Sequence, residues 1–289
     1  MTDQAATLRV IRGGGGSSQP PTILAPARRA IAVAGGKGGV GKSTIAVNLA
    51  LAYAQSGSRT LVVDTDLGMA DLNLLLGVAP ERSILDALGG TPVQDVLLAA
   101  HGIHLLPALN GSYLLSTIGA GVQRRMLELV DTLASQFDTL IIDIAAGIGQ
   151  SQTMFAGATT DAIIVVNPEP LSIADAYACL KVLATEQGVR HAYLVPNRVS
   201  SRAHADELVA RLGALVARFL DLEVTALPPI PADPAVAEAA QIGVPLLAHA
   251  PDSPAARAIR QLTRTLATFA PAPSDSWWRV SARAQGGSR

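Results

Sequence analysis

A glycine-rich loop is the part of the sequence whose residue types and spacing point most directly to chemistry. Residues 36–43 read GKGGVGKS and fit the pattern GxxxxGK[ST], in which glycines let backbone N–H groups turn inward around phosphate oxygens. We expect Lys42 to reach the β- and γ-phosphates of a nucleotide and the Ser43 hydroxyl to bind Mg²⁺. The residues expected to line this phosphate site are Gly36, Lys37, Gly38, Gly39, Val40, Gly41, Lys42, Ser43 and Thr44.

The lysines of the chain are concentrated at this loop. Among its 22 basic residues, three are lysines (Lys37, Lys42 and Lys181), and two of these three lie within the loop. A compact ammonium group is what a phosphate loop of this type uses. Lys37 adds a second cation, which stabilises phosphate charge and can act from a partner chain in the manner of an arginine finger.

Carboxylates follow two of the apolar runs that we expect to be strands. The run VVDTD contains Asp64 and Asp66, and the run LIID ends with Asp143. The carboxyl ends of parallel strands face the ligand crevice of an open sheet, so these side chains are expected beside the phosphates. Asp143 stands where a Walker B aspartate holds Mg²⁺ through water. Capping of a helix is the alternative role for any one of the three.

Polar residues after two further strands are candidates for contact with a base. Asn167 and Glu169 follow the fifth expected strand, and Asn197 follows the sixth. An amide can both donate to and accept from the edge of a base. A turn in the loop is the alternative role for Asn197.

The elements that must position these residues alternate along the chain. Short runs of Ile, Val and Leu, mostly apolar on both faces, are typical of covered parallel strands, and longer helical patterns lie between them. This order predicts an α/β fold, a doubly wound and mostly parallel sheet of about seven to eight strands flanked by helices. The expected strands are Ile31–Ala34, Thr60–Val63, Ile103–Leu106, Thr139–Ile142, Ala162–Val166, Ala192–Val195 and Val224–Leu227. The expected helices are Thr44–Gln55, Val122–Gln136, Ser172–Glu186, Ala203–Phe219 and Pro254–Phe269.

Composition excludes several classes of protein. With 49% hydrophobic and 16% charged residues, the 289-residue chain is neither disordered nor fibrous. Its single cysteine, Cys179, excludes an internal disulfide, and two copies would supply two thiolates where an iron–sulfur cluster needs four. The low cysteine content favours the cytoplasm. Residues 1–30 contain no apolar stretch typical of a secretory signal.

The charge distribution argues against a nucleic-acid-binding body. Residues 31–270 carry 15 basic and 21 acidic side chains, whereas a protein that coats DNA needs a basic surface. We therefore expect no direct contact with nucleic acid. Residues 96–123 lack charged side chains, but their proline, asparagine and glycines favour a buried strand and a loop over a membrane-spanning helix.

Four segments are expected along the chain. A short N-terminal segment (1–12) precedes a Gly/Ser/Pro tether (13–28), which reads as flexible. The globular body follows at 29–269, and a tail occupies 270–289. The apolar stripe of the last expected helix is interpreted as core packing.

The loop resembles the deviant Walker A motif of the MinD/ParA family of dimerising ATPases, because Lys37 occupies its second position. The resemblance implies ATP and Mg²⁺ as ligands and slow ATP hydrolysis that depends on dimerisation. It also implies that Lys37 crosses the dimer interface to the nucleotide of the other subunit. Asp66 would position the attacking water, Asp64 would support the metal, and Asn197 would bind adenine.

Longer blocks are similar to one branch of that family, the FlhG/FleN proteins that set flagellar number and placement. These blocks are VVDTDLGMADLNLLLG, IIDIAAGIG, NPEPLSIADAYACLK and PPIPADPAVAEAAQIGVPL. The N-terminal segment matches the DQAxxLR element of this branch through Asp3, Gln4, Leu8 and Arg9, which implies stimulation of an FlhF-type GTPase. A flagellar switch-complex protein and a FleQ-type transcription factor are further partners of the branch. A positioning ATPase for the septum site or for DNA partition is the alternative.

The tail and two positions depart from the family pattern. Family members usually end in an amphipathic membrane-binding helix, whereas this tail is short and carries both tryptophans, Trp277 and Trp278. We expect transient contact with the inner face of the cell membrane when two tails act together. Asp71 replaces the usual asparagine and Ile144 a small hydroxyl residue, so slower hydrolysis is expected.

Overall fold

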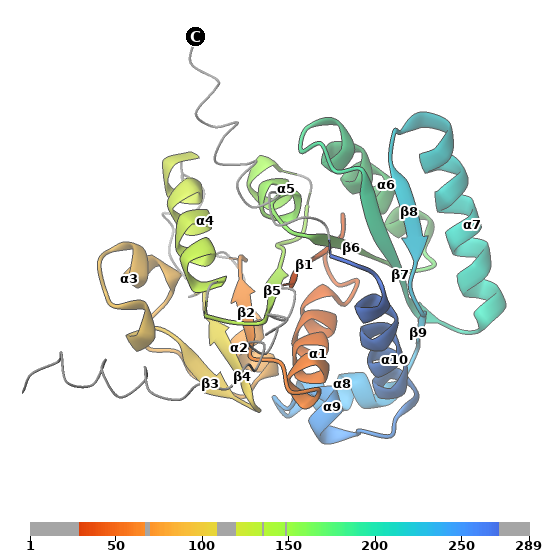
Figure 1. The fold of residues 1–289 in the computed structure, drawn as a ribbon. Coiled ribbons are helices and arrows are strands. Elements are labelled where there is room, and N and C mark those ends of the chain that lie inside the picture. Colours follow the sequence, from red (N-terminus) through yellow and green to blue (C-terminus); the bar gives the residue numbers. More distant parts are fainter. Residues whose placement is uncertain (1–28, 67–69, 109–119, 135, 148, 272–289) are drawn as a thin grey trace, which may run out of the picture.

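The computed structural model describes residues 29–66, 70–108, 120–134, 136–147 and 149–271 (Figure 1). Within these ranges nine strands form one sheet with the order β3-β4-β2-β5-β1-β6-β7-β8, and β9 pairs with β7. All pairs are parallel except β3 with β4. The strands are β1 (Arg29–Ala34), β2 (Thr60–Asp64), β3 (Leu98–Ala100), β4 (Ile103–Leu106), β5 (Thr139–Asp143), β6 (Asp161–Val166), β7 (His191–Val199), β8 (Glu223–Ala226) and β9 (Ile230–Pro231).

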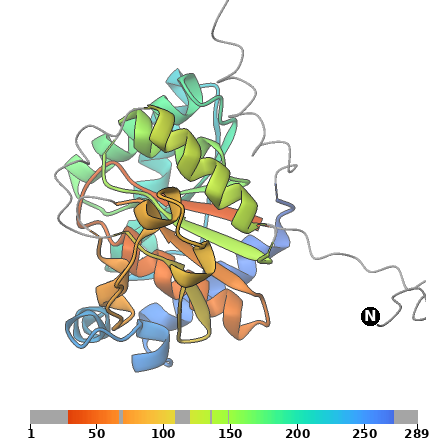
Figure 2. The same ribbon diagram turned by 90° about the vertical axis from the view of Figure 1, so that its left-hand side faces the viewer.

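Helices cover both faces of this sheet, as the view along its edge shows (Figure 2). They are α1 (Lys42–Gln55), α2 (Leu72–Leu75), α3 (Ile84–Leu88), α4 (Ala120–Ala134), α5 (Gln150–Gly157), α6 (Pro170–Thr185), α7 (Arg202–Phe219), α8 (Pro234–Gln241), α9 (Leu246–His249) and α10 (Pro254–Thr268), with a 3-10 turn at Val93–Asp95. Buried side chains of α4, α5, α6 and α7 share one apolar cluster, and those of α1, α9 and α10 share another. The predicted doubly wound α/β fold is confirmed.

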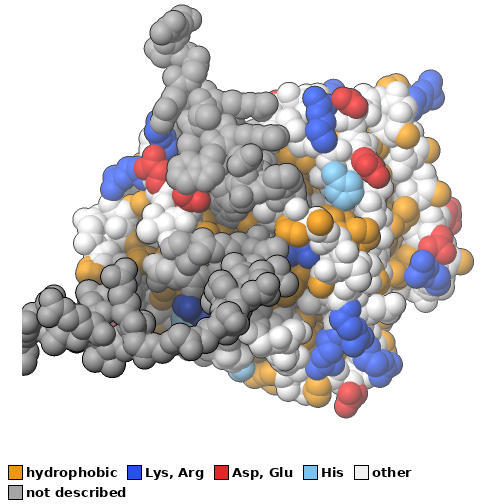
Figure 3. Space-filling view, in the orientation of Figure 1, with side chains coloured by type: hydrophobic (Ala, Val, Ile, Leu, Met, Phe, Trp, Pro, Cys, Tyr) orange, Lys and Arg blue, Asp and Glu red, His pale blue; other side chains and the backbone are white. Residues whose placement is uncertain are grey.

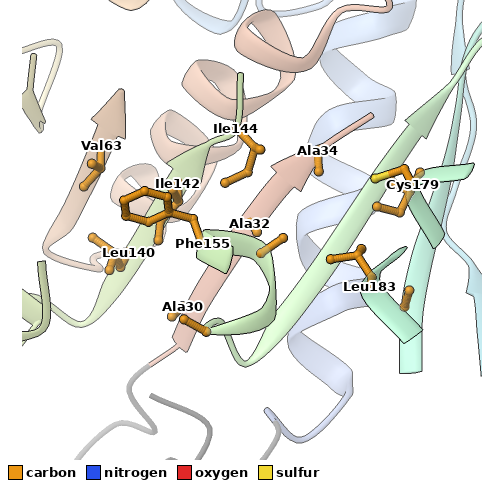
Figure 4. Close-up of a cluster of buried hydrophobic side chains, with 14 of the residues drawn as sticks. Ala30, Ala32, Ala34, Val63, Leu140, Ile142, Ile144, Phe155, Cys179 and Leu183 are labelled. Carbon is orange, nitrogen blue, oxygen red and sulfur yellow. The ribbon is translucent and has the colours of Figure 1, made fainter. Parts of the chain in front are cut away.

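The central strand β1 shows why the two faces differ. Its residues alternate, so Ala30, Ala32 and Ala34 face one cluster while Ile31 and Val33 face the other. The small alanine side chains leave room for the bulkier residues of α5 and α6, which lie over this face (Figure 4). Such close packing of apolar side chains on both faces is typical of a parallel sheet.

Short elements are what the sequence analysis missed. The three residues of β3 form an antiparallel edge beside β4; α2, α3 and α9 have four or five residues each, and α5 and α8 have eight. Elements of this length carry too few residues for a periodic pattern. The charge-poor run 96–123 contains β3 and β4, and its residues 109–119 lie outside the described part. In the part of the chain that the structure describes, no helix has the length and apolar character needed to span a bilayer.

A buried ion pair joins the two ends of the folded body. Arg29 donates to both carboxylate oxygens of Asp161, at 2.9 and 3.0 Å, and to the carbonyls of Leu266 (2.7 Å) and Phe269 (2.9 Å). The predicted core packing of the last helix is confirmed for Ile259, Leu262 and Leu266, which are buried, but not for Phe269, which is exposed just after α10. The proposed segments 1–12 and 13–28, and residues 272–289 of the tail, lie outside the described residues.

Candidate functional site

The glycine-rich loop lies between the end of β1 and the start of α1, at the carboxyl edge of the sheet. Gly39 and Gly41 have φ values of 75° and 99°, in the region that side chains disfavour. Gly36 is tightly enclosed, because a Cβ atom there would lie 2.1 Å from the carbonyl oxygen of Asp175 in α6. Gly38, in contrast, has no such neighbour within 4 Å. The glycine pattern thus serves both the turn and its packing against α6.

Lys42 begins α1 with its side chain turned into the loop. The residue is 7% exposed, and its Nζ atom lies 3.4 Å from the carbonyl oxygen of Lys37. Burial lowers the pKa of Lys42, while the nearby Asp143 and Asp66 act in the opposite direction. A buried ammonium group with few fixed partners is suited to neutralise an incoming phosphate.

The predicted carboxylates meet at the ends of two adjacent strands. Asp64 of β2 pairs in register with Asp143 of β5, and both are buried. The intervening segment is fixed by Thr65, whose hydroxyl donates to the carbonyl oxygen of Asp143 at 2.7 Å. The backbone N–H of Asp66 donates to Asp64 Oδ1 at 2.9 Å. The three aspartates are therefore brought together, as their strand-end positions predict.

Burial perturbs both strand-end carboxyls. It raises the pKa of Asp143 to about 7, although a hydrogen bond with the Ser43 side chain and the charge of Lys42 oppose the shift. Burial, followed by the charge of Asp143, raises the pKa of Asp64 well above its usual range. Two buried carboxyls side by side disfavour ionisation unless a cation joins them.

This donor set fits Mg²⁺. Asp143 Oδ1 is buried and has no hydrogen-bond partner among the described residues, so an acceptor is available there. Mg²⁺ takes oxygen ligands and is usually held by one or two carboxylates together with substrate phosphates. The described part of the chain holds no cluster of three or more His, Cys, Asp and Glu side chains of the kind that encloses a metal by itself.

Lys37 forms an ion pair within its own chain. Its Nζ atom lies 2.8 Å from Glu169 Oε2, and both side chains are partly exposed. This pairing lowers the pKa of Glu169. Glu169 immediately precedes α6 and holds the ammonium group of the loop, while its contact with a nucleotide stays a prediction.

Asn197 contacts the loop directly. Its Nδ2 atom donates to the carbonyl oxygen of Val40 at 2.7 Å. A Cβ atom at Gly41 would lie 2.5 Å from the same Nδ2 atom, so the glycine makes room for the amide. Asn167 lies at the end of β6, where its Oδ1 atom is buried without a hydrogen-bond partner among the described residues. The amide of Asn197 thus braces the loop, a contact that spacing alone does not reveal.

Further residues at the site escaped the sequence analysis. Asn48 of α1 donates to the carbonyl oxygen of Thr44 and accepts from the N–H of Leu247 in α9. The position of Asn48 as an amide amid the apolar residues of α1 is a sequence signal for such a contact, since buried polar groups are hydrogen-bonded. The packing of Asp175 against Gly36 had no such signal, since the two residues are 139 positions apart.

The two departures from the family pattern occupy different surroundings. Asp71 directly precedes α2, and its pKa is raised by burial and by the charge of Asp66. Ile144 is buried in the apolar cluster next to β5. The predicted partner-binding residues Asp3, Gln4, Leu8 and Arg9 lie outside the described residues.

Comparison with known proteins assigns the family. The ParA family model, described as NUBPL iron-transfer P-loop NTPase, matches residues 27–267. This chain belongs to the MinD/ParA family of P-loop ATPases. The one cysteine of this MinD/ParA chain, Cys179, gives no support for iron transfer. It is buried, and burial raises the pKa of its thiol to about 11.

Named relatives of this MinD/ParA chain agree with that assignment. The antiactivator FleN of Pseudomonas aeruginosa is 37% identical over 213 residues, which cover 73% of the chain and 76% of FleN. The flagellum site-determining protein YlxH of Helicobacter pylori is 34% identical over 172 residues, which cover 59% of the chain and 58% of YlxH. The septum site-determining protein MinD of Pyrococcus horikoshii, solved with Mg-ADP, is 26% identical with a TM-score of 0.70, covering 82% of this chain and 95% of that one. The family predicted from the loop is therefore confirmed.

Proposed function

We propose that this chain is an ATP-hydrolysing switch that dimerises with ATP and regulates flagellar number and placement. The observation that supports it most strongly is the convergence at one edge of the sheet. The buried Lys42, the Ser43–Asp143 hydrogen bond and the adjacent Asp64 all lie where the glycine loop opens. Phosphoryl transfer depends mainly on such positioning and on charge stabilisation.

In the proposed reaction, water attacks the γ-phosphate of ATP and yields ADP and phosphate. Lys42 binds the phosphates, Ser43 and Asp143 would hold Mg²⁺, and the bound ion would supply positive charge that stabilises the phosphates. Asp64 supports this site from the neighbouring strand. Asp66 orients the attacking water, and its backbone is already tied to Asp64 at 2.9 Å.

Lys37 is proposed to act on the nucleotide of the partner subunit. In the single chain its ammonium group is held by Glu169 at 2.8 Å. Ion pairs that are this exposed contribute little net stability, so exchange of the carboxylate for a phosphate is energetically accessible. Lysine side chains from two subunits would then contact the same triphosphate. Dimer formation would therefore depend on the nucleotide.

The flagellar role rests on the named relatives and on the N-terminal segment. YlxH is named for flagellum site determination, and FleN as an antiactivator. The segment DQAATLR is proposed to stimulate an FlhF-type GTPase, with Gln4 orienting its attacking water. A flagellar switch-complex protein and a FleQ-type transcription factor are proposed as additional partners, and the tail is proposed to contact the membrane transiently.

Two measurements test this function. The mass of the full chain in solution, with ATP or ADP present, should show a dimer with ATP only, and Lys42→Ala should stay a monomer in both. A constant mass with both nucleotides contradicts the switch.

GTP hydrolysis by an FlhF-type GTPase should rise on addition of the chain and fall back with Gln4→Ala. Thr7→Ala, at a variable position of the same segment, is the matched control, and equal rates with both variants contradict the activator role.

A further inference from the structure

The outward face of α10 carries a stripe of three arginines, Arg257, Arg260 and Arg264. Their spacing of three and four residues places them on one side of the helix, over about 10 Å of its length. The opposite side is buried against the core through Ile259, Leu262 and Leu266. In the space-filling view, blue side chains gather at the lower right, over α10 (Figure 3).

The charges of this arginine stripe are not matched by carboxylates in contact. Within the described ranges, none of the three arginines forms an ion pair, whereas five arginines elsewhere do. Arg257 and Arg260 instead donate to the backbone carbonyls of Asp252 and Pro251. Arg257 also lies close enough to Asp233 to help lower the pKa of that carboxyl, whose oxygens accept the N–H groups of two helix starts. The stripe thus keeps most of its positive charge facing outward.

Charge is strongly segregated along the chain. Residues 31–252 carry 12 basic and 21 acidic side chains, whereas residues 253–289 carry six arginines and one aspartate. The net charges of these two parts are −9 and +5. All charged residues of α10 are therefore basic although the body is acidic, and a surface of this charge attracts anions.

We propose that the arginine stripe of α10 docks on an anionic lipid surface. This proposal rests on the membrane contact proposed above for the tail and assigns a second, folded contact to it. The end of α10 leads through the exposed Phe269 into the segment that holds Trp277 and Trp278. Tryptophan with arginine is the composition of a membrane interface.

Contact by both the tail and the arginine stripe would give stronger membrane binding than the tail alone. The tail is short, and one weak anchor gives only marginal binding to a membrane. Each arginine near an anionic surface strengthens binding by about fivefold, so three arginines contribute roughly 100-fold. Because charge interactions with lipids are screened, this contribution falls with added salt.

The test is co-sedimentation of the full chain with vesicles in the presence of Mg-ATP. Vesicles of phosphatidylcholine alone are compared with vesicles of equal parts phosphatidylcholine and phosphatidylglycerol. The variant changes Arg257, Arg260 and Arg264 to Gln. The matched control changes Arg202, Arg211 and Arg218 of α7 to Gln, which removes the same charge from another exposed helix. Thermal melting of each variant shows whether the fold is kept, and a triple change to Lys keeps the charge.

We expect the chain and the α7 control to bind the anionic vesicles similarly, with loss at high salt. The α10 Gln variant should bind on the order of 100-fold more weakly, and the Lys variant should retain binding. Equal binding of the α10 and α7 Gln variants would contradict docking through the arginine stripe but not the membrane contact of the tail. If no form of the chain binds, both the stripe proposal and the tail proposal are wrong. Stripe-dependent binding to double-stranded DNA, without binding to vesicles, would assign the stripe to nucleic acid and also overturn the proposal.

Discussion

Replacing Asp143 by asparagine should move stability and ligand binding in opposite directions. The carboxyl is 3% exposed, and its Oδ1 atom has no hydrogen-bond partner among the described residues. In the chain without nucleotide, burial and the neighbouring carboxylates work against its charge. The amide introduced by Asp143→Asn has nearly the same shape as the carboxylate and no charge to desolvate.

The size of the stability difference between Asp143→Asn and the original chain follows from the pKa of Asp143. A pKa of about 7 in the folded chain lies above the ordinary value of 3.8, so between these pH values the native state binds more protons than the unfolded state. Stability therefore falls as the pH rises through this window, and the whole loss is present above pH ~7. At 1.36 kcal/mol for each pKa unit, the interval from 3.8 to about 7 corresponds to a loss on the order of 4 kcal/mol. Asp143→Asn should be more stable by this amount at pH ~8 and by little at pH ~4.

The assay is urea unfolding of both proteins at these two pH values, without and with Mg-ATP. Mg-ATP should stabilise the original chain by about 2.7 kcal/mol at 100 times its dissociation constant, and Asp143→Asn much less. Asp161→Asn is the matched control at the opposite edge of the sheet. Because it breaks the buried pair with Arg29, it should lose about 3–5 kcal/mol at both pH values.

One outcome would refute this reasoning. If Asp143→Asn is less stable than the original chain at pH ~8 without ligand, the carboxylate makes a structural contact that stabilises the fold. Unchanged stabilisation by Mg-ATP would show that Asp143 does not hold the metal.

Three further substitutions test the contacts around the site and the body. Arg29→Ala should lower the free energy of unfolding by about 3–5 kcal/mol, because Asp161 would be left buried without its partner; an unchanged urea midpoint contradicts this. Gly36→Ala should weaken ATP binding in calorimetry far more than Gly38→Ala, since only the former meets a backbone atom, at 2.1 Å; equal effects contradict the packing argument. Asn197→Ala should weaken ATP binding by about tenfold, because the buried loop carbonyl loses its donor, and unaltered affinity would remove Asn197 from the site.

The parts of the site that sequence could predict are those fixed by local pattern. The glycine loop must join a strand to a helix, and Asp64 and Asp143 must share an edge because parallel strands end together. Contacts between side chains distant in sequence could not be predicted this way. Lys37 meets Glu169 across 132 residues, and Asn197 turns toward a loop carbonyl 157 residues away.

The same limit applies to the fold. Long helices and apolar strands could be predicted to within a few residues, because many side chains contribute to each pattern. Arg29 is different, since by sequence it is one more arginine at the start of the body, yet it is buried and paired with Asp161. Sequence shows the charge of an arginine but not the carboxylate that folding places beside it.

Mixing two inactive chains tests most directly whether the nucleotide site is shared between subunits. Lys37→Ala lacks the crossing lysine, and Asp66→Ala lacks the residue that orients water. In a mixed dimer, the site of the Lys37→Ala chain keeps its own Asp66 and receives Lys37 from the other subunit. Mixing should therefore restore ATP hydrolysis to about a quarter of the original rate if chains pair at random. If Lys37 acts within its own chain, the mixture stays as inactive as either variant alone.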